Sequence, residues 1–274
     1  SSWLDSPLLS SLRVEIALYL LLMAVAALMR FWDLDSRAFH HDESLHATYS
    51  WYLYVGRGYE HSPMMHGPFQ FVGNTLSFIL FGASDASARY LYALFGTALV
   101  GLPYLLRHWL GRWGGLAIAA LLAFSPSMLY FSRFTRNDIL IAVWTLALVV
   151  CLWRYLEERR PLYLYLGAAF LSLSFATKEV TFITVAILGS FLLLATAWEW
   201  GGQIRKFDLS RLSPAASFLL LLGTLSLPQF AALSNLLLKR WGLDPAQAIA
   251  PGAPKEGLIA ATVVTLGLLG LTVL

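Results

Sequence analysis

The chain has 274 residues, of which 58% are hydrophobic and only 13% are charged. Soluble domains carry about 25% charged residues, so this composition excludes a soluble globule and indicates an integral membrane protein. The formal net charge of +3 is spread over loops between apolar segments, which is typical of membrane proteins and argues against a nucleic-acid-binding role.

Long apolar segments predict an all-α fold, a polytopic membrane helix bundle with about eight spans, since a crossing takes about 20 helical residues. The chain stops inside an apolar segment, so we expect a single transmembrane domain over 1–274 that is incomplete at its C-terminus. The segments expected to cross are 14–32, 90–106, 114–132, 139–156, 162–177, 180–200, 213–233 and 257–274.

One further apolar segment, 69–82, is too short to cross. At about 1.5 Å per residue it reaches about 21 Å, whereas the hydrocarbon core is about 30 Å thick. We therefore predict a helix that lies in the membrane interface, within a large first outer loop over 33–89. Parity then places this loop, the turn at 133–138 and Lys178–Glu179 on one side. Arg and Lys residues in short loops on the other side mark that side as cytoplasmic.

Acidic and histidine residues gather directly after the first span. Asp42 and Glu43 form an acidic pair, and a carboxylate there is suited to take a proton from an incoming hydroxyl as a general base. The alternative is that these polar side chains only meet water. Five of the six histidines lie between His40 and His66, which makes His41, His46, His61 and His66 candidates for substrate or divalent-metal binding. Their spacing matches no specific zinc signature, so no metal is assigned.

Two further groups of charged residues flank later spans on the same predicted side. Arg133 and Arg136 are candidates for binding a phosphate, with Asp138 facing the reacting group. The alternative is a helix N-cap flanked by two snorkelling arginines. Lys178 and Glu179 lie at a membrane boundary, where ionisable residues are costly and usually partnered or functional. Here the alternative is a tight turn with both side chains reaching water.

Four stretches follow one another in an order that matches a known pattern. They are Asp42–Glu43 after the first span, His66–Phe69 before a short helix, Gly82–Asp85 leading to Arg89, and Ser132–Phe134 with Asp138 and Thr177–Glu179. Over roughly residues 14–200 the chain thereby resembles the GT-C superfamily of integral-membrane glycosyltransferases. Within it, the chain looks like the protein-mannosyltransferase and aminoarabinose-transferase-like branch, which includes flippase-activity-associated relatives.

The resemblance implies transfer of a sugar from a polyprenyl-phosphate carrier to a hydroxyl acceptor at the outer face of a prokaryotic plasma membrane. Asp42 would activate the acceptor hydroxyl with Glu43 beside it, and Asp138 would support the acceptor side. The candidates for the donor-phosphate site are Arg133, Arg136, Lys178 and Glu179.

Two other function classes remain open at this stage. The chain could be a non-catalytic GT-C-like subunit of a larger membrane assembly, in which case it would co-purify with partner subunits and show no sugar turnover. It could also be a flippase or transporter of lipid-linked sugars, which an assay of lipid translocation in vesicles distinguishes from sugar transfer.

Overall fold

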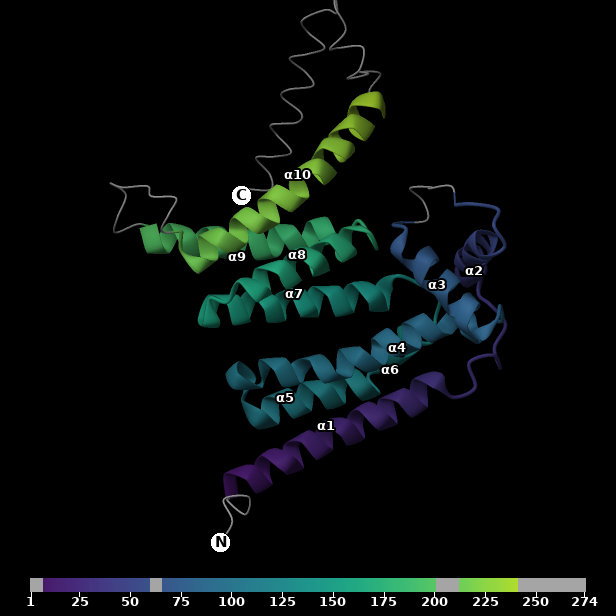
Figure 1. Cartoon of the computed structure of the whole chain (residues 1–274), viewed down its shortest axis with the longest axis horizontal. Coiled ribbons are helices and arrows are strands. Elements are labelled where there is room, and N and C mark those ends of the chain that lie inside the picture. Colours follow the sequence, from purple (N-terminus) through teal and green to yellow (C-terminus); the bar gives the residue numbers. More distant parts are fainter. Residues whose placement is uncertain (1–6, 60–65, 201–211, 241–274) are drawn as a thin grey trace, which may run out of the picture. The chain divides into compact units, whose positions relative to one another are not determined.

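The computed structural model describes residues 7–59, 66–200 and 212–240. These residues form helices joined by loops, with no strand among them, which confirms the predicted all-α class (Figure 1). The elements are α1 (Pro7–Phe31), α2 (His41–Tyr54), α3 (Phe69–Phe81), α4 (Ser87–Gly101), the 3-10 helix η3 (Leu102–Leu106), α5 (Arg107–Phe124), α6 (Pro126–Ser132), α7 (Asp138–Glu158), α8 (Pro161–Phe175), α9 (Thr181–Trp200) and α10 (Pro214–Arg240).

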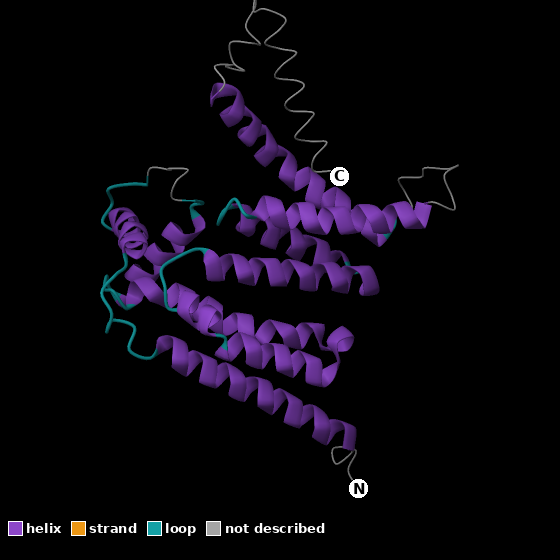
Figure 2. Ribbon diagram, turned by 180° about the vertical axis from the view of Figure 1, so that it is seen from behind, coloured by secondary structure: helices purple, strands orange, loops and turns teal. Residues whose placement is uncertain are grey.

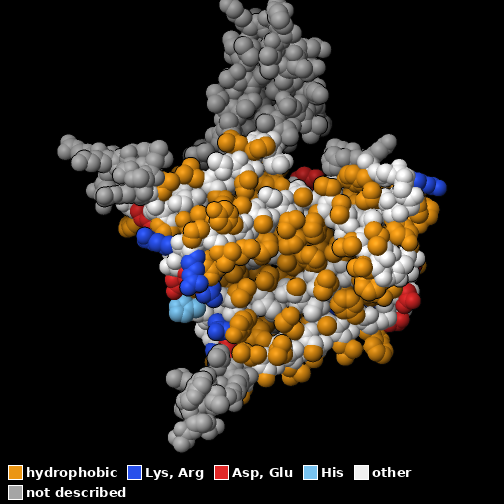
Figure 3. Space-filling model, in the orientation of Figure 1, with side chains coloured by type: hydrophobic (Ala, Val, Ile, Leu, Met, Phe, Trp, Pro, Cys, Tyr) orange, Lys and Arg blue, Asp and Glu red, His pale blue; other side chains and the backbone are white. Residues whose placement is uncertain are grey.

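Four helical segments are long and apolar enough to cross a membrane: Val14–Phe31, Ser87–Phe124, Asp138–Glu158 and Thr181–Glu199. Shorter apolar helices cover Phe69–Phe81, Pro161–Phe175 and Pro214–Gln229. Hydrophobic side chains cover much of the face visible in Figure 3, while charged side chains lie mainly at its margins. The chain is an integral membrane protein. The number of eight spans stays a prediction, and the last expected span, 257–274, lies outside the described residues.

Two predicted spans are divided in the structure. The segment expected at 114–132 ends as α5 at Phe124, and α6 begins at Pro126. Ser125 before this proline has an extended backbone (φ −56°, ψ 124°), because a residue that precedes proline is disfavoured in the helical region. The segment expected at 90–106 similarly gives way to the 3-10 helix after Gly101. Both divisions fall at a proline that follows an apolar run.

The described chain divides into two compact units, one built from residues up to 150 with 173–179, the other from the remainder. In the second unit, Trp153 of α7 stacks on Phe191 of α9 with ring centroids 5.6 Å apart. A Cβ added at Gly167 of α8 would lie 3.0 Å from the Phe218 ring, so glycine allows this close approach to α10. The predicted functional residues that the structure describes all belong to the first unit.

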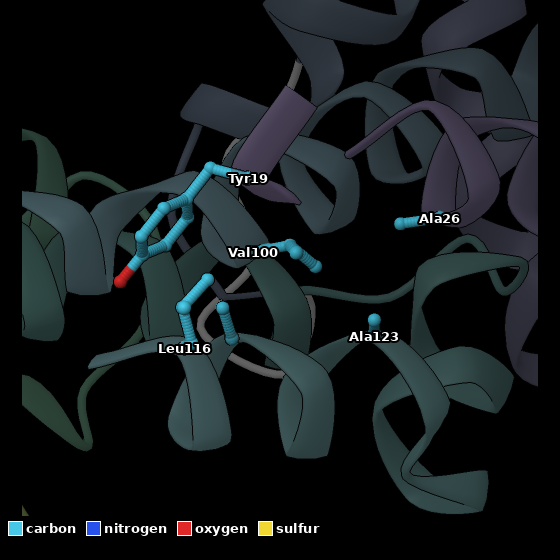
Figure 4. Close-up of a cluster of buried hydrophobic side chains, with 6 residues drawn as sticks. Tyr19, Ala26, Val100, Leu116 and Ala123 are labelled. Carbon is cyan, nitrogen blue, oxygen red and sulfur yellow. The ribbon is translucent and has the colours of Figure 1, made fainter. Parts of the chain in front are cut away.

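The core of the first unit joins α1, α4 and α5. Figure 4 shows Tyr19 and Ala26 of α1 beside Val100 of α4 and Leu116 and Ala123 of α5. The alanines leave room for close packing of the helix backbones, as is usual between membrane helices.

Arg30 reinforces this core where α1 meets the end of α5. Its guanidinium is fully buried and donates to the carbonyl oxygens of Leu122 at 2.9 Å and Ala123 at 3.2 Å. Carbonyls in the last turn of a helix have no partner within that helix, so the arginine satisfies them. It also donates to the Ser132 hydroxyl at 3.2 Å, which attaches α6 to the same core.

The loops of the first unit gather at one end of its long helices. Figures 1 and 2 show the loops after α1 and after α6 at this end, together with α2 and α3. In Figure 1, α2 is seen nearly end-on, so it runs across the direction of α1 and α4. The helix α3 spans residues 69–81, as the short apolar segment predicts. That α2 and α3 lie in the membrane interface stays a prediction.

Candidate functional site

Three segments that are distant in sequence meet through a chain of alternating charges, which we call the ion-pair chain. Arg136 Nη1 lies 3.1 Å from Asp42 Oδ2, and Arg136 Nε lies 3.6 Å from Asp138 Oδ2. Lys178 Nζ lies 2.7 Å from Asp138 Oδ1. The ion-pair chain thus brings together four of the predicted functional residues from the start of α2, the loop after α6, the start of α7 and the loop after α8.

Local sequence fixes the position of Asp42. The backbone amide of Asp42 donates to His40 Nδ1 at 3.3 Å, and the amide of His40 donates to the Glu43 carboxylate at 3.1 Å. This capping box starts α2, and acids in the first turn of a helix are stabilised by its free amides. Asp138 occupies the equivalent place at the start of α7.

Glu43 differs sharply from its neighbour because it is fully buried. It accepts hydrogen bonds from Arg89 Nε at 2.9 Å, from Arg37 Nη2 at 2.8 Å and from the Thr135 amide at 3.1 Å. Burial raises the pKa of Glu43, but hydrogen bonds from Arg89, His40 and Thr135 outweigh burial and hold that pKa below its ordinary value. Glu43 therefore fastens α2 to α4 and to the loop after α6, a geometry that favours positioning over contact with substrate.

Arg133 is also engaged within the protein. Its Nη1 donates to the carbonyl oxygens of Met29 at 2.7 Å and Trp32 at 2.6 Å, and its Nη2 donates to that of Asp33 at 3.1 Å. Met29 lies in the last turn of α1, and Trp32 and Asp33 follow the helix directly, so the guanidinium acts as a C-terminal cap. Both arginines were predicted to bind phosphate, but their partners differ: Arg133 binds backbone carbonyls, whereas Arg136 pairs with carboxylates.

The segments around His66 and Lys178 are joined directly through their backbones. The Gly67 amide donates to the Thr177 carbonyl at 3.1 Å, and the Phe69 amide donates to the Ala176 carbonyl at 2.9 Å. A Cβ at Gly67 would lie 2.1 Å from the Ala176 oxygen, so only glycine fits. His66 has φ +63° and its Nδ1 lies 2.7 Å from Glu179 Oε2. A strained non-glycine backbone of this kind is common at functional sites.

The predicted histidines do not form one cluster. His46 is buried against Gln70, and burial, with a smaller effect from nearby positive groups, lowers its pKa to about 4. His41 is exposed, and His61 lies outside the described residues. Within the described part of the chain, no group of three His, Cys, Asp or Glu residues is placed to hold a metal ion. The divalent metal stays a prediction, and no chemical step is assigned to it.

Two residues that contact Glu43, Arg37 and Arg89, were given no role by the sequence pattern. Arg89 is buried near the start of α4, and a charged residue in an apolar segment usually has a partner. That signal could have identified Arg89 as structurally important, although not its bond to Glu43.

The two acids of the ion-pair chain are not equivalent. Both oxygens of Asp138 face a cation, whereas Asp42 is paired only through Oδ2 among the described residues. The Asp42 side chain is also 37% exposed. Asp42 is therefore the carboxylate more available to accept a proton, and Arg136 and Lys178 are the cations that an incoming anion would meet.

Comparison with protein families gives a match over residues 65–209, more than half of the chain, to the family described as dolichyl-phosphate-mannose-protein mannosyltransferase. Comparison with curated proteins gives no match. The match confirms the resemblance to the GT-C superfamily, while the narrower branch stays a prediction. The chain belongs to the dolichyl-phosphate-mannose-protein mannosyltransferase family, a GT-C type of membrane glycosyltransferase.

Proposed function

We propose that the chain transfers a sugar from a polyprenyl-phosphate carrier to a hydroxyl group of an acceptor at the outer face of the membrane. The observation that carries this proposal is the ion-pair chain, in which the available Asp42 carboxylate contacts Arg136, and Asp138 links Arg136 to a second cation, Lys178. The family supports the donor class, since its description names a lipid-phosphate-linked sugar.

Asp42 acts as the general base in this proposal. The acceptor oxygen forms a bond to the anomeric carbon of the sugar while the bond from that carbon to the carrier phosphate breaks. The hydroxyl proton passes to Asp42, and the carrier leaves with its phosphate and the electron pair of the broken bond. Attack on the face opposite the phosphate inverts the anomeric configuration. A positioned base of this kind contributes about 10²- to 10⁴-fold to a rate.

Arg136 and Lys178 stabilise the negative charge that builds up on the departing phosphate. Their side chains are 35% and 20% exposed, so an anion reaches them without unfolding a core. Charge-assisted hydrogen bonds from fixed cations are strong, and such fixed charges often supply a large part of catalysis. Asp138 holds both cations in position before the donor binds.

The test measures transfer of tritiated mannose from polyprenyl-phosphate mannose in membranes that contain the full chain. We expect Asp42→Asn to lower the transfer rate at least about 100-fold. Asp35→Asn is the matched control, because Asp35 is an exposed acid in the loop just before α2. Undiminished transfer by the Asp42 variant would remove this residue from the mechanism. If the unaltered chain shows no transfer and co-purifies with stoichiometric partner subunits, the non-catalytic alternative replaces the proposal.

A further inference from the structure

A hollow lies in the first unit, where α2, the end of α3 and the loop before α4 meet. Its volume is about 240 Å³. The side chains that shape it include Thr48 and Trp51 of α2 and Asp85 of the loop. Pockets for drug-sized ligands usually measure about 300–1,000 Å³, so this hollow suits a smaller molecule.

The hollow is separate from the ion-pair chain. Trp51 follows Asp42 by nine residues on α2, which is about 2.5 helical turns. The two side chains therefore project from opposite sides of the helix. None of the residues of the ion-pair chain lines the hollow.

Aromatic and small side chains define its shape. Trp51 is 38% exposed and offers a flat apolar wall, with Phe39 also in the lining. Ala47, Ala83 and Ala88 contribute only methyl groups. Larger residues at these positions would fill the space, so the hollow depends on the alanines.

Its polar groups limit the charge of the ligand. Asp85 is exposed and has no hydrogen bond or ion pair within the described part of the chain. Its carboxylate repels anions such as phosphate and can accept hydrogen bonds from two neighbouring hydroxyls. The Arg57 guanidinium lies 5.4 Å from the centre of the Trp51 ring, which disfavours a cation at that ring. A neutral molecule with several hydroxyls and an apolar face meets both conditions.

We propose that this hollow binds one sugar ring of the acceptor, with Trp51 against the apolar face of the ring and Asp85 accepting from two of its hydroxyls. The acceptor is then a glycan or glycolipid. One of its sugars occupies the hollow, away from the hydroxyl group that receives the transferred sugar. This inference rests on the proposed transferase function, which it deepens by naming the class of acceptor.

The binding test needs neither donor nor turnover. The full chain is placed in lipid nanodiscs, because sugar-based detergents would compete. Saturation-transfer NMR is then recorded with methyl α-mannopyranoside, methyl β-glucopyranoside and methyl β-galactopyranoside. We expect ring-proton signals for at least one glycoside, and an at least tenfold weaker affinity in Trp51→Leu and in Asp85→Asn.

Trp113→Leu and Asp35→Asn are the matched controls, because Trp113 is a more exposed tryptophan of another helix and Asp35 is an exposed acid outside the hollow. Both should bind the glycoside as the unaltered chain does. Absence of binding by all three glycosides, or unchanged affinity in both Trp51→Leu and Asp85→Asn, would overturn the proposal.

Failure of this inference can be told apart from failure of the transferase function. Asp42→Asn should keep full glycoside binding, because Asp42 lies outside the hollow. In the transfer assay, Asp85→Asn should raise the acceptor KM about tenfold and leave kcat within about twofold. Glycoside binding without any transfer by the unaltered chain would contradict the transferase proposal alone. Transfer with an unchanged acceptor KM in Asp85→Asn would contradict the sugar-binding proposal alone.

Discussion

Lys178 Nζ lies 2.7 Å from Asp138 Oδ1, and Arg136 Nε lies 3.6 Å from the other oxygen of the same carboxylate. Asp138 thus holds two cations from different loops at one place. Asp138 is therefore less able to accept a proton, because each of its oxygens already faces a positive charge. Asp42, which contacts Arg136 through one oxygen only, is left as the group that can take a proton.

The two acids should therefore respond differently to loss of charge. We expect Asp138→Asn to raise the KM for the polyprenyl-phosphate donor roughly 10-fold, because Lys178 and Arg136 lose the carboxylate that orients them. Asp42→Asn should instead lower kcat and leave the donor KM close to that of the unaltered chain. Steady-state transfer rates at varied donor concentration separate the two effects. An equal fall of kcat in both variants, with no change in KM, would show that the acids share one role.

The two arginines of the loop after α6 should also separate. Arg133→Gln removes donors to three carbonyl oxygens at the end of α1 and should lower the free energy of unfolding by about 1 kcal/mol, since these bonds are only partly buried or exposed and water can replace the lost donors. Arg136→Gln should change stability little and weaken donor binding. Thermal unfolding and donor KM are measured on both variants. A stable Arg133 variant with a raised donor KM would show that Arg133 binds the donor phosphate after all.

Part of this arrangement follows from sequence patterns alone. The shortness of residues 69–82 and the parity of the later spans place Asp42, Asp138 and Lys178 on one side, and the ion pairs of the structure show that these residues meet. The inference uses only helix length and bilayer thickness, which are fixed quantities, and the membrane side of these residues stays a prediction. It needs no knowledge of packing.

Other features depend on packing and could not be predicted. Arg133 and Arg136 are alike in sequence, and only the position of the α1 end shows that one of them is a cap. The bond between Glu43 and Arg89 joins residues 46 positions apart, and no periodicity predicts such a pair. The hollow beside Asp85 arises from three alanines on different elements, each of which is unremarkable in its own segment.

Gly67 should be intolerant of any side chain. A Cβ there would lie 2.1 Å from the Ala176 oxygen, so Gly67→Ala must separate the segment before α3 from the segment that carries Lys178. We expect transfer activity to fall more than tenfold and thermal stability to fall as well. Gly114→Ala is the control, because its Cβ would meet only ordinary contact at 3.6 Å. Normal activity in the Gly67 variant would mean that this junction does not position Lys178.

Glu43 should matter for stability more than its neighbour does. Glu43→Gln leaves Arg89 buried without its carboxylate, and loss of one partner of a buried ion pair typically costs about 3–5 kcal/mol. Asp42→Asn alters a pair that is about one-third exposed on each side and should cost far less. Thermal unfolding of both variants in one detergent gives the comparison.

A double variant tests the cause of the loss. In Glu43→Gln with Arg89→Met, the uncompensated charge is removed, and we expect part of the stability to return. A double variant no more stable than Glu43→Gln would argue against Arg89 as the source of the loss.

His46 should make the stability of the first unit dependent on pH. Burial lowers its pKa from 6.5 to about 4, so between these values the unfolded chain binds a proton that the folded chain does not. The free energy of unfolding must then fall as pH falls from 6.5 to 4, by up to about 3 kcal/mol from this residue. His46→Gln removes the titrating group and should flatten this part of the profile, whereas His41→Gln, which alters an exposed histidine, should not. Equal slopes for the unaltered chain and the His46 variant in thermal unfolding from pH 7 to pH 4 would show that another group causes the acid sensitivity. Glu43 affects the free energy of unfolding at lower pH. Its pKa in the folded chain lies below the ordinary 4.5, so its stabilising charge is lost as pH falls from 4.5 through this lowered pKa.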